Sequence, residues 1–172
     1  WRLEIKKYPR LTEVGAWAGQ NENRLGGYYS QDDIREIIAY AAVRNVEIIP
    51  EIEFPAHMLS AVVAYPWLSC TGKQHEVPRQ HFISRDLLCV GKETSYEFLA
   101  DVLEETADLF PSEYINIGGD EAVYDRWKEC PLCQQVMQRE GLTRVSDLQG
   151  YLTNVVADMM KQKGKTVVGW EE

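Results

Sequence analysis

Residues 114–121 read Tyr114-Ile115-Asn116-Ile117-Gly118-Gly119-Asp120-Glu121, and they combine the pattern of a strand with two glycines and two acids. It begins with apolar, largely β-branched or aromatic residues, which favour a strand. Two glycines follow at once, and glycine in that place marks a break or a close approach of the backbone. The stretch therefore predicts a short strand over 114–117 whose carboxyl end carries two adjacent acids.

Helical and strand patterns alternate on both sides of this strand. Ser30 and Asp33 form a capping box at the start of the first helix, and Pro50 demotes the middle of the next strand or marks its end. A short helix near 57–64 and a loop over 66–91 separate the first two units. The predicted helices span 31–45, 94–110 and 148–163, and the other predicted strands span 46–52 and 166–170. This alternation predicts an α/β fold with parallel strands.

Polar residues follow each predicted strand. The three strand ends read Pro-Glu-Ile-Glu-Phe-Pro-Ala-His over 50–57, Gly-Gly-Asp-Glu over 118–121, and Gly-Trp-Glu-Glu over 169–172. In parallel sheets covered by helices, chemistry is found at the carboxyl ends of the strands. The acids, His57 and Trp170 are therefore expected at one edge of the sheet, and this coincidence indicates an active site.

The acid pair Asp120-Glu121 suits acid–base chemistry. Adjacent like charges raise the pKa of at least one carboxyl, and a general acid needs a raised pKa near neutral pH. Neighbours in a regular strand point to opposite faces, so both acids reach one ligand only if the strand breaks, which Gly118 and Gly119 permit. The alternative is an acidic N-cap of a following helix.

His57 and Trp170 are the other candidate site residues. His57 follows Glu51 and Glu53, and a histidine near carboxylates can relay or share a proton. Trp170 at a strand end suits a wall on which a sugar ring stacks. A structural histidine and a buried core tryptophan are the respective alternatives.

The four cysteines leave several states open. Cys130 and Cys133 have the CxxC spacing of half a zinc site, which Cys70 and Cys89 could complete. A zinc ribbon usually has two CxxC pairs, so free thiols, a Cys70–Cys89 disulfide or a Cys130–Cys133 disulfide are favoured, and no metal is expected. The chain contains no dinucleotide-binding glycine motif and no Walker loop, so no cofactor is expected either.

Composition narrows the class of partner. The 172 residues include 18 basic and 27 acidic side chains, for a net charge of −9, which argues against nucleic acid. No apolar run is long enough to span a membrane. Five Trp and nine Tyr are a supply that suits stacking on a sugar.

Residues 114–121 resemble the catalytic signature of glycoside hydrolase family 20, the β-N-acetylhexosaminidases. Further segments occur in the family's order, so that the resemblance covers essentially the whole chain: 1–12, 26–29, 50–57 and 169–172. A whole (β/α)8 TIM barrel takes roughly 250 residues. The resemblance therefore implies one partial catalytic domain over 1–172, from about the second helix to the fifth strand of such a barrel.

The resemblance also implies removal of terminal β-linked N-acetylglucosamine or N-acetylgalactosamine from a carbohydrate, with retention and with the substrate's acetamido oxygen as nucleophile. Glu121 would be the general acid and base, and Asp120 would hold the acetamido group and stabilise the oxazolinium intermediate. His57, Trp170 and Glu172 would bind substrate, His57 within the network around the acid. The residues themselves leave the localisation open, and the resemblance implies work in the periplasm, outside the cell or in lysosomes.

The chain departs from the family's usual pattern at Asn116, where His is common, at Ala56, where Gly is common, and at Glu53 and Glu171, where Asp is frequent. Asn116 could weaken a hydrogen bond behind the acid pair. Two alternative functions stay open. One is an inactive barrel fragment that self-associates through exposed strand edges. The other is a module that binds N-acetylhexosamine without cleaving it.

Overall fold

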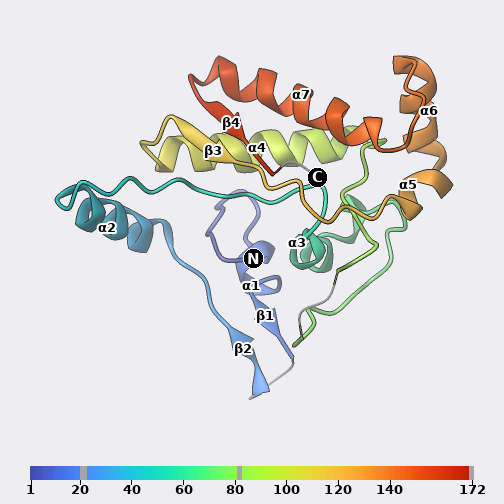
Figure 1. Cartoon of the computed structure of the whole chain (residues 1–172). Coiled ribbons are helices and arrows are strands. Elements are labelled where there is room, and N and C mark those ends of the chain that lie inside the picture. Colours follow the sequence, from blue (N-terminus) through green and yellow to red (C-terminus); the bar gives the residue numbers. More distant parts are fainter. Residues whose placement is uncertain (20–22, 81–82, 171–172) are drawn as a thin grey trace.

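The computed structural model describes residues 1–19, 23–80 and 83–170 (Figure 1). Within these ranges, no helix combines the length and the apolar character needed to cross a membrane. The elements in chain order are α1 (Arg10–Glu13), β1 (Trp17–Ala18), β2 (Leu25–Gly26), α2 (Gln31–Ala42), α3 (Leu59–Ala64), the 3-10 turn η2 (Pro66–Leu68), α4 (Glu93–Leu109), β3 (Tyr114–Asn116), α5 (Asp125–Glu129), α6 (Pro131–Glu140), α7 (Asp147–Gln162) and β4 (Thr166–Val168).

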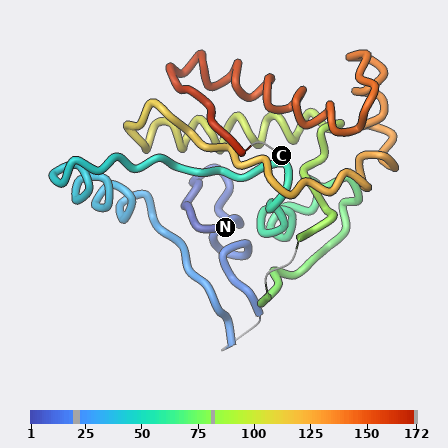
Figure 2. Tube along the Cα trace, in the orientation of Figure 1, coloured from blue at the N-terminus to red at the C-terminus, as the bar shows by residue number. Residues whose placement is uncertain are grey.

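The strands that position the site are parallel. Strand β3 pairs with β4 so that Ile115 lies opposite Val167, and Glu51 forms a parallel bridge to Asn116 on the other side of β3. The segment that contains Glu51 therefore lies beside β3, which lies beside β4 (Figure 2). This arrangement confirms the α/β class with parallel strands that the sequence predicted. A short antiparallel hairpin of β1 and β2, which the sequence did not indicate, projects from the rest of the chain (Figure 1).

The strand expected over 46–52 is wrong in extent, because only Glu51 takes part in a bridge. The carbonyl of Pro50 accepts from the Asn116 N–H at 2.9 Å, and the Ile52 N–H donates to the Asn116 carbonyl at 2.9 Å. Proline has no N–H, so pairing cannot extend past Pro50 on that side. The strand expected over 166–170 likewise ends at Val168.

The helices follow the apolar periodicity. The capping box of α2 is confirmed: the Asp33 N–H donates to Ser30 Oγ at 3.1 Å, and the Ser30 N–H donates to the Asp33 carboxylate at 2.8 Å. Helices α5 and α6 were not expected from the sequence. Their ends nevertheless carry ordinary signals, since Pro131 begins α6 and Gly141, at φ 65°, ends it.

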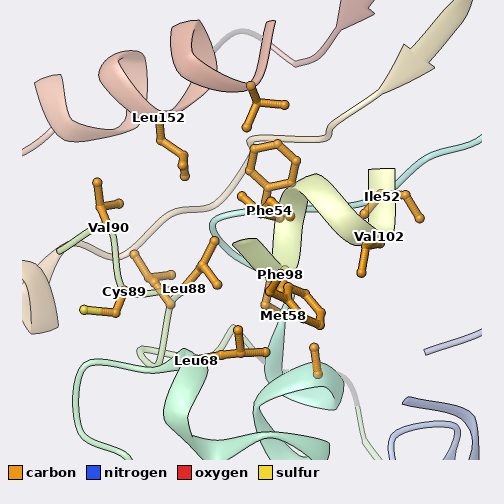
Figure 3. Packing of buried hydrophobic residues seen from close by; sticks show 14 of the residues in the cluster. Ile52, Phe54, Met58, Leu68, Leu88, Cys89, Val90, Phe98, Val102 and Leu152 are labelled. Carbon is orange, nitrogen blue, oxygen red and sulfur yellow. The ribbon is translucent and has the colours of Figure 1, made fainter. Parts of the chain in front are cut away.

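One apolar cluster forms the core between the sheet and the helices. Phe98 and Val102 of α4 and Leu152 of α7 point into it, together with Phe54 and Met58 from the segment beyond Glu51 (Figure 3). Helix α4 packs on α7, and α7 packs on β4. Burial of these side chains fixes the sheet against its helices, so the loops that follow the strands start from a rigid base.

Trp127 of α5 is the largest fully buried side chain, and we expect its replacement to be costly. Its Nε1 donates to the Leu88 carbonyl at 2.9 Å, and its ring stacks on Tyr124 with centroids 5.4 Å apart. Trp127→Ala in the full-length protein should lower the free energy of unfolding by about 3–5 kcal/mol, measured by urea denaturation. Trp67→Ala is the matched control, since Trp67 is 38% exposed, and equal losses in the two variants would contradict the expectation.

Candidate active site

The acid pair lies on a backbone break directly after β3. Gly118 and Gly119 have φ of 65° and 107°, which L side chains rarely adopt. A Cβ on Gly118 would overlap the carboxylate of Glu53. Glu121 itself has φ of 52°, and such strain in a non-glycine residue is typical of functional positions. The break that the sequence predicted is therefore present.

The structure brings His57 to both acids. His57 Nε2 lies 3.2 Å from Glu121 Oε2 and 3.6 Å from Asp120 Oδ2, and all three side chains are half-buried. His57 also has a positive φ, of 51°. Because α5 begins only at Asp125, the acid pair is not its N-cap, and that alternative is wrong. The three side chains form a cluster in which a proton can be shared between imidazole and carboxylate.

Glu53 supports this cluster from behind. Its Oε1 accepts from the Gly119 N–H at 2.8 Å. Burial raises the pKa of Glu53 to about 7, and the nearby charge of Asp120 and a hydrogen bond with it act in the same direction, against the lowering effect of the Gly119 N–H. Glu53 thus has a raised pKa, although the sequence presented it only as a neighbour of His57 and a variant of the family pattern.

Asn116 supplies a further hydrogen-bonded link under the site. Its Nδ2 donates to the Glu51 carboxylate at 2.6 Å, and its Oδ1 accepts from the Gly118 N–H at 2.9 Å. The residue that departs from the family's histidine therefore fixes the first glycine of the break and ties it to the neighbouring segment.

Gln149 of α7 holds the other side of the break. Its Nε2 donates to the Gly119 carbonyl at 2.5 Å, while its Oε1 accepts from the Tyr124 hydroxyl at 2.7 Å. No sequence motif predicted that Gln149 would hold the break, because Gln149 occupies an ordinary position in an amphipathic helix. The break is thus held from two sides, by Glu53 and by Gln149.

One acceptor of the cluster has no partner. Asp120 Oδ1 is shielded from solvent and makes no hydrogen bond among the described residues. An acceptor in that state is costly unless a donor reaches it, and two donors suit it: the proton that Glu53 holds next to Asp120, and an N–H or O–H of a ligand. A cavity of about 300 Å³ opens beside the cluster, lined in part by Glu51, Glu53 and His57 but not by the acid pair.

Trp170 lies next to the break through its backbone, since its N–H donates to the Gly118 carbonyl at 2.9 Å. Trp170 is 58% exposed, so the alternative of a buried core tryptophan is wrong. Glu172 and Glu171 lie outside the described residues. Of the predicted site residues, the structure therefore brings Asp120, Glu121 and His57 into contact and Trp170 beside them.

The raised pKa of Glu53 predicts a pH dependence of stability. Between pH 4.5, the ordinary value, and about pH 7, folded Glu53 holds a proton that the unfolded chain has released. The free energy of unfolding should therefore fall as pH rises through this window and level off above it. Glu53→Gln keeps an acceptor for Gly119 but cannot titrate, so its decline should be shallower.

Urea unfolding of the full-length protein at several pH values checks this. Glu47→Gln, an exposed position on the preceding segment, is the matched control and should follow the unmodified protein. Identical slopes for the unmodified protein and Glu53→Gln would contradict the burial argument.

The four cysteines lie together in a second cluster, and none forms a disulfide. Short sulfur–sulfur distances join Cys70 to Cys133, at 3.7 Å, and Cys89 to Cys130, at 3.8 Å. These pairs differ from the two disulfides that the sequence left open. Neither of those disulfides is formed, so free thiols and the zinc site are the two alternatives that stay open. Like the cluster of His57 and the acid pair, this one has donor types that bind metals.

Comparison with known proteins gives a consistent result. The family model described as glycosyl hydrolase family 20, catalytic domain, matches residues 1–172. A β-hexosaminidase of Porphyromonas gingivalis is 42% identical over 173 residues, which are 100% of this chain and 22% of that protein. The solved structure of a β-N-acetylhexosaminidase from Bacteroides fragilis matches with a TM-score of 0.89 and 40% identity, over 99% of this chain and 33% of that one.

The exo-β-N-acetylglucosaminidase of Vibrio harveyi, solved in complex with N-acetylglucosamine, matches with a TM-score of 0.87 and 38% identity. The match covers 99% of this chain and 28% of that structure. The chain therefore spans a third or less of each of these proteins.

Proposed function

The chain belongs to glycosyl hydrolase family 20, and from this premise we propose that the protein carrying it removes terminal β-linked N-acetylhexosamine from carbohydrates. The observation that carries the proposal is the cluster of His57, Asp120 and Glu121 on the break after β3. The relatives named above are β-hexosaminidases and β-N-acetylhexosaminidases. Glucosamine and galactosamine forms of the substrate both fit this proposal.

The proposal includes the architecture. Residues 1–172 would form one partial catalytic domain, from about the second helix to the fifth strand of a (β/α)8 barrel. Parallel β3 and β4 with α4 and α7 on one side support this reading. Val43, 79% exposed, and Val46 are apolar side chains that a complete barrel would cover. On an isolated chain they would favour the self-association expected from the sequence.

Glu121 would supply both proton transfers. In the first step the substrate's acetamido oxygen attacks the anomeric carbon, the bond to the leaving oxygen breaks, and Glu121 gives its proton to that oxygen. In the second step water attacks the anomeric carbon, Glu121 takes the water's proton, and the acetamido group is restored. The nearby His57 Nε2 would position the Glu121 carboxyl and exchange a proton with it.

Asp120 would act on the acetamido group. Its unpartnered Oδ1 is the acceptor that the acetamido N–H needs, and its charge stabilises the cationic oxazolinium intermediate. An adjacent acid pair suits this division of labour, because both carboxylates serve one side of the reaction centre rather than facing each other across the sugar. Trp170 would provide a stacking wall and Glu172 a polar contact to the sugar.

The test uses the full-length protein and three 4-methylumbelliferyl glycosides: the N-acetyl-β-glucosaminide, the N-acetyl-β-galactosaminide and the β-glucoside. We expect release of the fluorophore only where an acetamido group is present, and proton NMR should show the β-anomer as the first product. Comparable cleavage of the β-glucoside would contradict the use of the acetamido group. Binding of N-acetylglucosamine in calorimetry without turnover would favour the binding module instead.

A further inference from the structure

The cluster of four cysteines lies outside the site described above, and the proposed reaction uses none of them. Cys70 follows η2, Cys89 ends the long loop, Cys130 immediately precedes α6, and Cys133 lies in the first turn of α6. Cys89 and Cys133 are fully buried, and Cys70 is half-buried at the rim. All four sulfur atoms lie within 4.8 Å of one another although they come from three separate segments.

The distances have the size that a tetrahedral metal site requires. Sulfur–sulfur distances are 3.7 Å for Cys70 and Cys133, 3.7 Å for Cys89 and Cys133, and 3.8 Å for Cys89 and Cys130. A tetrahedron with metal–sulfur bonds of about 2.3 Å has edges of about 3.75 Å. Three edges of the cluster therefore match the geometry that four thiolates adopt around one zinc ion.

We propose that Cys70, Cys89, Cys130 and Cys133 bind one structural Zn²⁺. A set of four sulfur donors in tetrahedral arrangement selects zinc or iron among the common metals, and zinc is the usual occupant of a closed four-cysteine site without redox function. Four protein ligands leave no open position for water or substrate, so the ion stabilises the fold and takes no part in hydrolysis. This proposal replaces the expectation of no metal, which rested on sequence spacing alone.

Backbone contacts hold the ligands in place. The Cys89 N–H donates to the Leu68 carbonyl at 2.8 Å, and an antiparallel bridge joins Ser69 to Leu88, so Cys70 and Cys89 are brought together by their neighbours in sequence. Gly91 makes room for the third segment, because a Cβ there would overlap the backbone of Leu132. The CxxC turn can therefore approach the long loop closely.

Charge around the cluster also suits an anionic site. Cys130 and Cys133 lie at the N-terminus of α6, a ten-residue helix whose first-turn N–H groups favour negative charge. Lys92 Nζ donates to the carbonyl of Ser69 at 2.7 Å. Because Ser69 directly precedes Cys70, this contact places a positive charge beside the segment that carries Cys70. One Zn²⁺ with four thiolates carries two net negative charges, which these groups offset.

The position of the site explains what it would stabilise. The Leu88 N–H, one residue before Cys89, donates to the Pro55 carbonyl at 3.0 Å, close to His57 in sequence. Cys130 and Cys133 follow the acid pair through α5, whose Trp127 binds the Leu88 carbonyl. A zinc ion here would tie together the two loops that carry His57 and Asp120-Glu121.

The experiment measures metal content in the full-length protein, purified under reducing conditions without chelator. Mass spectrometry of metals should find about one zinc per chain, and the Co²⁺-substituted protein should show the visible bands of tetrahedral thiolate coordination. Cys133→Ser should lose the zinc, whereas Met137→Leu, which removes a buried sulfur one turn later in α6, should retain it.

Should Cys133→Ser fail to fold, the half-buried Cys70 gives a second pair of variants. Cys70→Ala should weaken zinc binding more than about 10-fold in chelator competition. Cys70→His should retain zinc with a shifted cobalt spectrum, because sites of three cysteines and one histidine also bind zinc. Each of four results would overturn the proposal: metal-free folded protein with four reactive thiols, a mass that shows disulfides, iron in place of zinc, or zinc affinity unchanged in Cys70→Ala.

Discussion

Replacing Glu121 by Gln in the full-length protein should lower kcat/KM on a 4-methylumbelliferyl N-acetyl-β-glucosaminide by roughly 10²–10⁴-fold, the usual contribution of general acid–base catalysis. The glutamine amide keeps the size of the side chain and its place beside His57 Nε2. It cannot, however, give a proton to the leaving oxygen. The loss therefore measures proton transfer rather than a change of fold.

The leaving group provides the sharper test of this assignment. A dinitrophenolate leaves without protonation, so Glu121→Gln should lose much less kcat/KM on a dinitrophenyl substrate than on the methylumbelliferyl one. Glu113→Gln is the matched control, because Glu113 lies directly before the N-terminal end of β3, whereas Glu121 follows its C-terminal end. Its kinetics should equal those of the unmodified protein. An unchanged rate for Glu121→Gln on the methylumbelliferyl substrate would refute the assignment.

Much of this site could be predicted from the sequence, because the patterns that indicate it lie within short segments of the chain. The apolar run before Gly118 predicted β3, and the glycine pair predicted the break on which Asp120 and Glu121 lie. His57 was placed near the acids by a rule about parallel strands, which requires only that the strands be identified. Residues whose role follows from backbone type and strand order are thus accessible to sequence reasoning.

Other parts depend on contacts between distant segments, and no local pattern contains them. The pKa of Glu53 is raised because tertiary packing buries its carboxyl against Gly118, and Gln149 holds the same loop from α7. Both contacts are consequences of tertiary packing. The extent of the strand expected over 46–52 was misjudged for a different, local reason, because pairing past Pro50 needs an N–H that proline lacks.

The cysteines show the same limit in a different way. Along the sequence only Cys130 and Cys133 have a recognisable metal-binding spacing. In the fold, the bridge between Ser69 and Leu88 gives Cys70 and Cys89 an equivalent closeness. A motif rule that counts residues between ligands misses a pair joined by antiparallel backbone, even though its sulfur atoms lie within 4.8 Å of each other and of the other two.

Asp120→Asn should lower kcat/KM by roughly 10²–10³-fold, the range found when one preorganised electrostatic group is removed from a reaction centre. The neutral amide no longer stabilises the positive charge of the oxazolinium intermediate. The acceptor that Asp120 Oδ1 offers to the acetamido N–H is also weakened. Asp125→Asn is the matched control, because Asp125 is a half-buried acid at the start of α5 that pairs with Arg85 and Lys128, and it should leave the rate unchanged.

The two acids should differ in their response to the leaving group. The acetamido oxygen attacks the anomeric carbon whichever group departs, so Asp120→Asn should cost about the same on methylumbelliferyl and dinitrophenyl substrates. Glu121→Gln should cost much less on the latter. If the loss in Asp120→Asn instead shrinks as the leaving group improves, then Asp120 donates the proton. The roles that we assign to the two adjacent carboxylates would then have to be exchanged.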